Sequence, residues 1–284
     1  MNSPPSLDDR ETVRRRLPAL LTLLQDDDDK VASLAMEQVL NSGLAEQTVA
    51  EFQEAPDPKL RQRIHQLNGI LNRRRLRHEF LEAVRNQRIG GWQGVIMINR
   101  ICDPQCSPQR IHDAVEALSV QVGQEGATAV RIAALMKEAT FAVPDEDVLD
   151  VDLYLAEQVL ESKDGASALL CAIAQQVGAE AGWKSTLVLH EGRFCLIGEH
   201  SLLVDPSENW RVARVNTETQ IHPCTPRDLW LGILTQILLV CLVDGNMQDL
   251  YQIGDLLCQL NGTRLDDALP HPLGREGAPA AAGE

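Results

Sequence analysis

Aromatic residues and positive charge are both scarce in this 284-residue chain. Phe, Trp and Tyr make up 4% of it, and 26 Lys and Arg stand against 41 Asp and Glu, which leaves a net charge of −15. So few rings favour a core of Leu, Val, Ile and Ala, as in packed helices. The negative charge disfavours nucleic acid or an anionic membrane surface as the partner of the whole protein.

The chain also lacks an apolar run of membrane-spanning length. The longest one, residues 229–243, is about five residues shorter than a typical span and contains Thr235 and Gln236. It therefore predicts a buried helix and no contact with a membrane. Residues 1–11 are polar, without the apolar stretch that a secretion signal needs. We expect a cytoplasmic protein.

No pattern of paired cysteines or zinc ligands is present. The seven cysteines are odd in number, and four of them lie in apolar runs, where a free thiol packs as a small hydrophobic side chain. Cys102 and Cys106 have the spacing of half a zinc site, but no second pair accompanies them and a structural zinc needs four ligands. The sequence predicts reduced thiols, no metal and no cofactor.

A helical pattern covers residues 11–88, after a polar, flexible leader over residues 1–10. Apolar side chains recur there every three to four residues, which is the period of an amphipathic helix. The acidic run Asp26 to Asp29 fits a turn between two helices, with Asp29 as the cap of the second. This region resembles a HEAT-type repeat, in which helix pairs are closed by acidic turns.

Residues 59–77 of that region are strongly basic and also carry an apolar stripe. One interpretation is the solvated face of a long amphipathic helix. Another is a docking surface for an acidic partner; nucleic acid is disfavoured because no aromatic residues interleave the charges. On this second interpretation the partner-binding candidates are Arg73, Arg74, Arg75 and Arg77.

Beyond Gly90 the pattern changes, and the chain as a whole predicts an α+β fold. Helices are expected over residues 92–101, 108–122 and 168–177, followed by short β-branched and apolar runs that predict antiparallel strands over 186–190, 193–198, 202–204 and 211–215. Two apolar helices are expected to follow, over residues 228–243 and 249–260. We assign a domain to residues 89–262, with a helical lead-in over 89–145, a core over 146–216 and closing helices over 226–262, and a disordered tail to 263–284.

One constellation in the core indicates a kind of chemistry. The run Gly165-Ala166-Ser167 precedes an apolar helix, and Gly192-Arg193-Phe194 and Asp205-Pro206 follow on two strands. A thiol acyl-transfer site has this spacing: a Cys at a helix N-terminus, a His on one strand and a carboxylate on the next. Here a serine stands at the first position and an arginine at the second.

The frame resembles that of the bacterial transglutaminase-like proteins of the SirB type. Residues 159–165 match the Val-Leu-Glu-x-x-x-Gly that opens the family motif, and Gly182 matches the glycine that ends its helix. Residues 192–196 stand at the His-bearing strand, and Asp205-Pro206 closes the set. The resemblance covers Arg14 to about Leu260. It implies a transglutaminase-like architecture, with a small antiparallel sheet packed on the helix at Ser167.

The resemblance places Ser167 at the nucleophile position, Arg193 at the base position and Asp205 at the orienting position. A serine needs a base to ionise, and arginine stays protonated in proteins. Loss of two members of such a unit removes essentially all of its catalytic advantage. Family members often carry Pro in place of the Cys, so the departure is not peculiar to this chain.

These residues also have structural interpretations. Ser167 fits the N-cap of the helix over residues 168–177, and Arg193 fits an ion pair with Asp205 that ties two strands together. His190 precedes Arg193 by three residues and is expected on the opposite face of the strand. His200 is expected in a turn.

We expect a non-catalytic, degenerate transglutaminase-like protein that acts as a binding or scaffolding module. Its cleft, near Ser167, Arg193, Asp205 and His190, would hold a peptide or an acidic ligand, with a protein or peptide as partner. One alternative is a hydrolase or acyltransferase whose nucleophile is Ser167 or a relocated cysteine. The relocated candidates are Cys195 and Cys224. Another alternative is an adaptor that works through the basic helix over residues 59–77.

Overall fold

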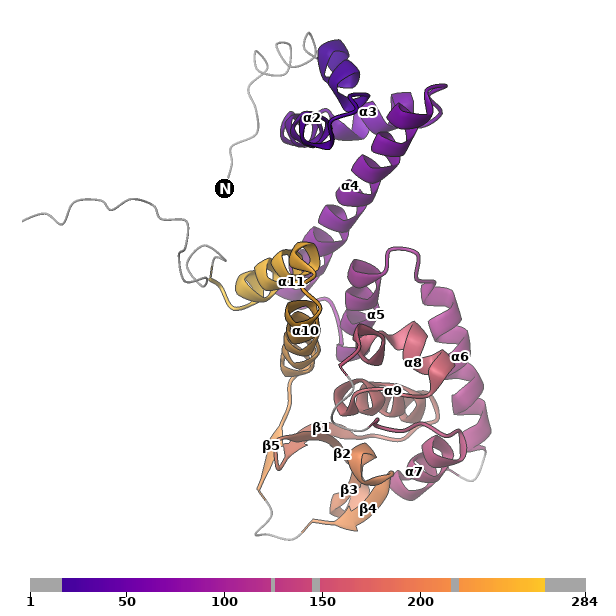
Figure 1. Ribbon diagram of the computed structural model, residues 1–284. Helices are drawn as coiled ribbons and strands as arrows, with labels where there is room; N and C mark the ends of the chain where they lie inside the picture. Colours follow the sequence, from indigo (N-terminus) through magenta and orange to yellow (C-terminus); the bar gives the residue numbers. More distant parts are fainter. Residues whose placement is uncertain (1–16, 124–125, 145–148, 216–219, 264–284) are drawn as a thin grey trace, which may run out of the picture. The chain divides into compact units, whose positions relative to one another are not determined.

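The computed structural model describes residues 17–123, 126–144, 149–215 and 220–263 (Figure 1). The chain divides into two compact units, Met1–Glu79 (unit 1) and Phe80–Glu284 (unit 2). Helices dominate both units, and a five-stranded antiparallel sheet lies in unit 2. The expected α+β class is confirmed. The leader expected over residues 1–10, and the tail expected over 263–284 apart from its first residue, lie outside the described residues.

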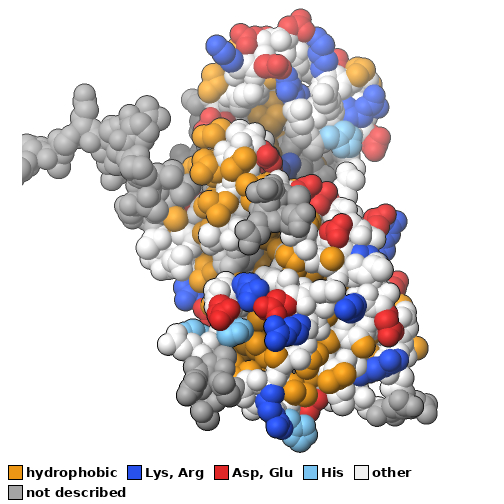
Figure 2. Space-filling model, turned by 60° about the horizontal axis from the view of Figure 1, so that its bottom comes forward, with side chains coloured by type: hydrophobic (Ala, Val, Ile, Leu, Met, Phe, Trp, Pro, Cys, Tyr) orange, Lys and Arg blue, Asp and Glu red, His pale blue; other side chains and the backbone are white. Residues whose placement is uncertain are grey.

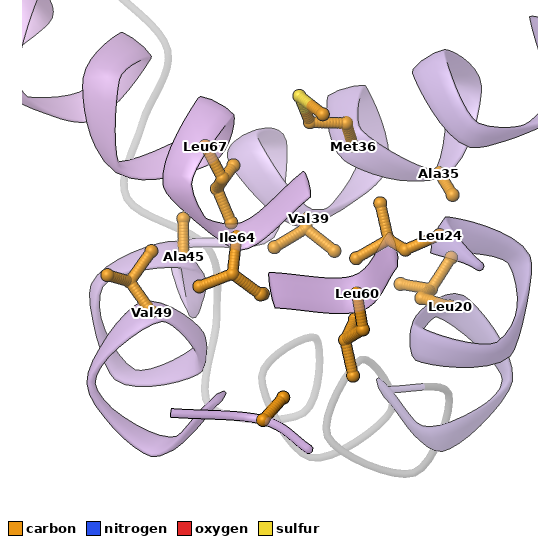
Figure 3. Close-up of a cluster of buried hydrophobic side chains, with 11 residues drawn as sticks. Leu20, Leu24, Ala35, Met36, Val39, Ala45, Val49, Leu60, Ile64 and Leu67 are labelled. Atoms are coloured by element: carbon orange, nitrogen blue, oxygen red, sulfur yellow. The ribbon is translucent and has the colours of Figure 1, made fainter. Parts of the chain in front are cut away.

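Unit 1 consists of helices around one aliphatic core. A helix over residues 17–24 is followed by α2 (Asp29–Asn41), α3 (Ala45–Phe52) and α4 (Pro58–Arg85), whose last turns belong to unit 2. Figure 3 shows their apolar side chains pointing toward one another. Val39, Ile64 and Leu67 are fully buried, and burying a side chain of this size stabilises the fold by about 1.5–3 kcal/mol. The helical pattern expected for this region is therefore present, and the HEAT-type comparison stays a prediction.

The acidic run of unit 1 contacts the start of its basic helix. Lys59 donates a hydrogen bond to Asp27, and Arg63 donates one to Asp29. Asp28 caps α2, because its carboxylate accepts from the backbone N–H of Lys30 at 2.8 Å. The expected cap, Asp29, is thus wrong by one residue: adjacent aspartates are chemically equivalent caps, and only the backbone path decides between them.

The unit boundary falls inside α4, whereas the sequence pattern places it near Gly90. Phe80 is completely buried and belongs to the core of unit 2. Its ring packs edge-to-face on Trp230, with 5.7 Å between the centroids. Gly90 instead serves as the N-cap of the next helix. A glycine pair therefore marked a helix start and not the end of a domain.

The helices of unit 2 enclose α9 (Ser167–Glu180). Nine of its 14 residues are buried, as expected for a helix that is apolar nearly all round. The strong N-caps Ser107, Thr128 and Thr225 begin three of the surrounding helices. The helices that contact α9 are α5 (Gly91–Cys102), α6 (Pro108–Val122), α7 (Ala129–Glu138), α8 (Ala156–Ser162) and α10 (Pro226–Val243). The short helix η1 (Val151–Tyr154) packs on α8 and α10, and α11 (Met247–Leu260) packs on α10.

The sheet packs on α9, which contacts the middle strand β2 and its neighbour β1 (Figure 1). The strand order is β4-β3-β2-β1-β5, and all neighbouring pairs are antiparallel. The four expected strands are present, and β5 is an addition of three residues, too short to show a pattern of its own. The bounds are β1 (Thr186–His190), β2 (Arg193–Ile197), β3 (Leu202–Asp205), β4 (Arg211–Arg214) and β5 (Ile221–Pro223), with the short helices η2 (Glu199–Ser201) and η3 (Pro206–Glu208) on either side of β3.

In the part of the chain that the structure describes, α10 is the one helix long and apolar enough to cross a membrane. It packs against α5, α9 and α11 and buries Leu229, Trp230 and Ile233. The buried helix predicted for this apolar run is only partly buried: 39% of α10 lies inside the structure, and Leu239, Leu242 and Val243 near its end are exposed.

Candidate functional site

Ser167 is the first residue of α9 and not its cap. The N-cap is Ala166, which has extended backbone and no capping side chain. Two backbone hydrogen bonds hold the chain here, from Gly165 N–H to Ala142 O at 3.0 Å and from Ala166 N–H to Leu153 O at 2.9 Å. They make the chain turn into the helix one residue earlier than expected. The predicted N-cap role of Ser167 is therefore wrong.

Gly165 explains why the motif needs a glycine two residues before Ser167. A Cβ at this position would lie 2.6 Å from a methyl group of Val159, closer than side-chain carbons approach one another. Gly165 thus lets the segment before α9 pass directly over α8. This requirement is purely steric and holds whatever residue follows at position 167.

The N-terminus of α9 opens into a pocket of about 330 Å³. The first backbone N–H of the helix that has an acceptor is that of Leu170, which donates to Ala166 O at 2.9 Å. The N–H groups of the three residues before it have no acceptor among the described residues, as expected at a helix start. The pocket wall also includes the Ser167 hydroxyl, which makes no hydrogen bond within the described residues.

The wall of this pocket is mostly apolar and carries no charged side chain among the described residues. Tyr154 and Gln236 supply its other polar groups, and burial raises the pKa of the Tyr154 phenol. No histidine lies in the described wall, so no base stands beside Ser167 there. The lining residues are Val143, Pro144, Leu149, Leu153, Tyr154, Ala166, Ser167, Ala168, Gly192, Phe194, Gly232 and Gln236.

Arg193 and Asp205 do not line this pocket. Strand residues alternate between the two faces of a sheet, and Phe194 is directed toward the helices, where its ring lies against Gly232 of α10. Arg193 and Cys195 therefore point to the other face. Leu196 of β2 pairs with Val204 of β3, so these two side chains project from the same face of the sheet. Asp205 is the next residue of β3 and therefore projects from the other face, as Arg193 and Cys195 do.

The other face of the sheet carries a small apolar cluster formed by strand and loop residues. Its buried members are Val188, Cys195 and Leu203. Figure 2 brings the lower side of Figure 1 forward and shows hydrophobic side chains there bordered by charged ones. The expected single cleft, with Ser167 beside Arg193 and Asp205, is thus replaced by two separate surfaces.

Arg193 is neutralised by a group of carboxylates. Its guanidinium lies 3.5 Å from Asp205, 3.4 Å from Glu208 and 3.5 Å from Glu191. Asp205 is the largest cause of the raised pKa of Arg193; burial opposes the rise and Glu208 adds to it. The Asp205 carboxylate is buried and also accepts the Ser207 N–H at 2.8 Å. The ion pair between β2 and β3 that the sequence suggests is present, and it leaves little charge for an acidic ligand.

His190 lies on the same face as Arg193, opposite to the expectation. The two residues pair directly across the β1–β2 hairpin, and directly opposed residues project from the same side of a sheet. The prediction counted alternating residues from Arg193 back to His190 as if both lay on one strand. Glu191 and Gly192 form a turn between them, with positive φ at both residues, so this count does not apply. His190 Nδ1 lies 3.4 Å from Gln220 O. His200, at φ 55° in η2, is in a turn as predicted.

The two candidate cysteines are poor nucleophiles. Burial raises the pKa of Cys195 to about 12, with Asp205 as the next cause, so about one thiol in 10⁵ is ionised at pH 7. Burial likewise raises the pKa of Cys224, and Asp228 adds to it. The pKa shifts in the same direction, with burial as the first cause, at Cys102, Cys106, Cys171 and Cys241.

In unit 1 the basic candidates lie on α4, as the periodicity predicts. Arg75 contacts Glu79 at 3.7 Å and donates to Asn72 at 2.8 Å, which reduces its availability to a partner. Arg74 is exposed, and Arg73 and Arg77 are half-buried. No cluster of three or more metal-ligating side chains is found in the described residues.

Sequence reasoning missed Tyr154 and Gln236 as pocket residues. They come from η1 and α10, on either side of Ser167 in the sequence, and nothing in their local pattern distinguishes them from core or surface residues. Comparison of the chain with protein-family models, curated proteins and solved structures finds no match. The site is therefore interpreted from its geometry alone.

Proposed function

We propose that this protein is a non-catalytic binding module of transglutaminase-like ancestry, and that the pocket at Ser167 is its binding site. The observation that carries the proposal is the pocket at the start of α9: its described wall is mostly apolar and carries no charged side chain, and the first N–H groups of the helix have no acceptor among the described residues. We place the module in the cytoplasm, with a protein or peptide as its partner.

The chemistry of the pocket supports binding over catalysis. A serine nucleophile needs a neighbouring base, and the described wall offers only Tyr154 and Gln236 beside the Ser167 hydroxyl. Burial raises the pKa of the Tyr154 phenol, so this side chain stays protonated at neutral pH and cannot act as the base. Arg193 is turned to the other face of the sheet and is held by three carboxylates.

The same groups define the ligand. Helix N-terminal N–H groups and a serine hydroxyl donate to oxygen acceptors, and the surrounding walls favour an apolar body. An uncharged backbone carbonyl beside an aliphatic or aromatic side chain meets both requirements. An apolar stretch of peptide is therefore a better ligand than the acidic one that the sequence suggested, because the described wall has no cation to offset a negative charge.

A binding experiment with simple peptide mimics tests the proposal. N-acetyl amino acid N-methylamides with apolar side chains should shift the NMR signals of the backbone N–H groups of Ser167, Ala168 and Leu169 in a saturable way. Gln236→Trp adds bulk at an exposed position of the wall and should abolish these shifts. Thr235→Trp adds the same side chain one residue away, outside the wall, and should leave them intact.

Binding that survives Gln236→Trp, or the absence of any saturable shift, would reject the pocket as the site. The enzyme alternative has a separate test, since a serine- or thiol-directed electrophile would then label one residue stoichiometrically. We expect no such labelling. The adaptor alternative requires that charge reversal at Arg73, Arg74 and Arg75 weaken partner capture while Gln236→Trp has no effect.

A further inference from the structure

A second and larger pocket lies in unit 2, of about 620 Å³, between α5, α6 and the C-terminal half of α9. This volume is within the range of small-molecule sites. It shares no residue with the pocket at Ser167. The lining residues are Gly90, Gly91, Trp92, Gln93, His112, Ala172, Gln175, Gln176, Ala179, Trp183, Lys184 and Ser185.

The charge of this wall is opposite to that of the chain. The protein has a net charge of −15, yet the twelve lining residues include no Asp or Glu. They do include Lys184 and His112. Among nearby acidic side chains, Glu180 accepts a hydrogen bond from Gln176 at 3.0 Å and does not line the pocket. A wall without carboxylates favours an anionic ligand over a cationic one.

The start of α5 gives this pocket backbone donors. Its N-cap is Gly90, which has no side chain, and the first helical N–H with an acceptor is that of Gly94. The N–H groups of Gly91, Trp92 and Gln93 precede it and have no acceptor among the described residues. Oxygen anions bind to such helix starts through these N–H groups and the helix dipole.

Two buried polar atoms of the wall are also unpaired. Trp92 Nε1 and Ser185 Oγ have no hydrogen-bond partner among the described residues. The other three tryptophans do: the Nε1–H groups of Trp183, Trp210 and Trp230 donate to Glu199, Phe141 O and Gly91 O. Buried polar groups are nearly always paired, so these two atoms are exceptions in this wall. Each has less than 1 Å² of accessible surface, so neither atom is part of the surface that a ligand would contact.

We propose that this pocket binds a small organic anion. Its carboxylate or phosphate group is held by the N–H groups at the start of α5 and by Lys184, and its flat apolar body lies along Trp92. This site is separate from the proposed peptide site at Ser167 and does not depend on it.

A titration with defined probes tests the second site. Phenyl phosphate and benzoate separate the two acidic groups, benzamide is the uncharged control, and inorganic phosphate lacks the ring. The readouts are the NMR signals of the Gly91, Trp92 and Gln93 N–H groups and of the Trp92 indole N–H. We expect saturable shifts with phenyl phosphate or benzoate, weaker binding of inorganic phosphate, and none with benzamide.

Lys184→Gln should weaken this binding about tenfold, because it removes one charge-assisted hydrogen bond. Lys137→Gln makes the same charge change at an exposed position of α7 outside the pocket and should have no effect. The proposal is overturned if no probe saturates, if benzamide binds as well as benzoate, or if the two lysine variants behave alike. Because the Ser167 signals report the first site, failure at one site is distinguishable from failure at the other.

Discussion

Glu199 connects three parts of unit 2 through one carboxylate. It accepts the backbone N–H of Ala129 at the start of α7 at 3.0 Å and the indole N–H of Trp183 at 2.6 Å. Partial burial raises the pKa of Glu199, but these hydrogen bonds outweigh it, and the net shift is downward from 4.5. A single polar side chain thus fixes the orientation of Trp183, which itself lines the second pocket.

This lowered pKa has a defined consequence for stability. The folded state prefers the ionised carboxylate, so its contribution is fully present above about pH 4.5 and is lost as the pH falls through the lower folded-state pKa. Glu199→Gln should destabilise the protein by about 1 kcal/mol at pH 7 and flatten the loss of stability between pH 5 and 3. Urea unfolding across this pH range measures both effects. Glu161→Gln, at an exposed position of α8, is the matched control; an equal pH slope in the two variants would contradict the assignment.

At the scale of elements, the contact between α5 and α10 depends on the missing side chain of Gly94. A Cβ there would lie 2.2 Å from the indole of Trp230, whose Nε1–H donates to Gly91 O at 2.9 Å. The indole is also packed on Phe80, so it cannot withdraw without breaking a second contact. The glycine permits a close approach that periodicity does not reveal.

Gly94→Ala should therefore destabilise unit 2 by about 1–3 kcal/mol, as overpacking does in other cores. Gly69→Ala on α4 is the contrasting variant, because no atom lies within 4 Å of the added Cβ. It should stabilise its helix by about 0.5–1 kcal/mol. Thermal or denaturant unfolding compares the two. If both substitutions stabilise the protein, helix propensity and not packing on Trp230 controls both positions.

At the scale of the whole molecule, the two units have separate cores. The cluster in unit 1 contains only residues before position 80, whereas all four tryptophans lie in unit 2. Tryptophan fluorescence therefore reports on unit 2 alone, and far-ultraviolet circular dichroism reports on the helices of both units. Compact units with their own cores are able to unfold as separate cooperative units.

Ile64→Ala removes a fully buried side chain from unit 1 and should cost about 2–5 kcal/mol. The transition followed by circular dichroism should shift, and the one followed by fluorescence should not. Ile233→Ala makes the same truncation at a fully buried position of α10 and should lower the fluorescence transition. If Ile64→Ala moves both signals together, the units unfold as one.

The amino-acid sequence alone determines most of the elements of this protein. Apolar periodicity indicates α4, α9, α10 and α11, and the β-branched runs indicate four of the five strands, because these patterns depend on neighbours within a few residues. The same local patterns also place Ser167 at a helix start and Arg193 near Asp205. The short elements α7, α8 and β5 are harder to recognise, since their few residues carry little pattern.

Only the tertiary structure decided which side chains meet. Pairing across the hairpin put His190 on the face of Arg193, and the alternation of β2 turned Arg193 away from the pocket at Ser167. Tyr154 and Gln236 line that pocket from η1 and α10, two elements that are far apart in the sequence. The physical reason is that backbone preferences act over a few residues, whereas register and packing are set by the burial of faces far apart in the chain.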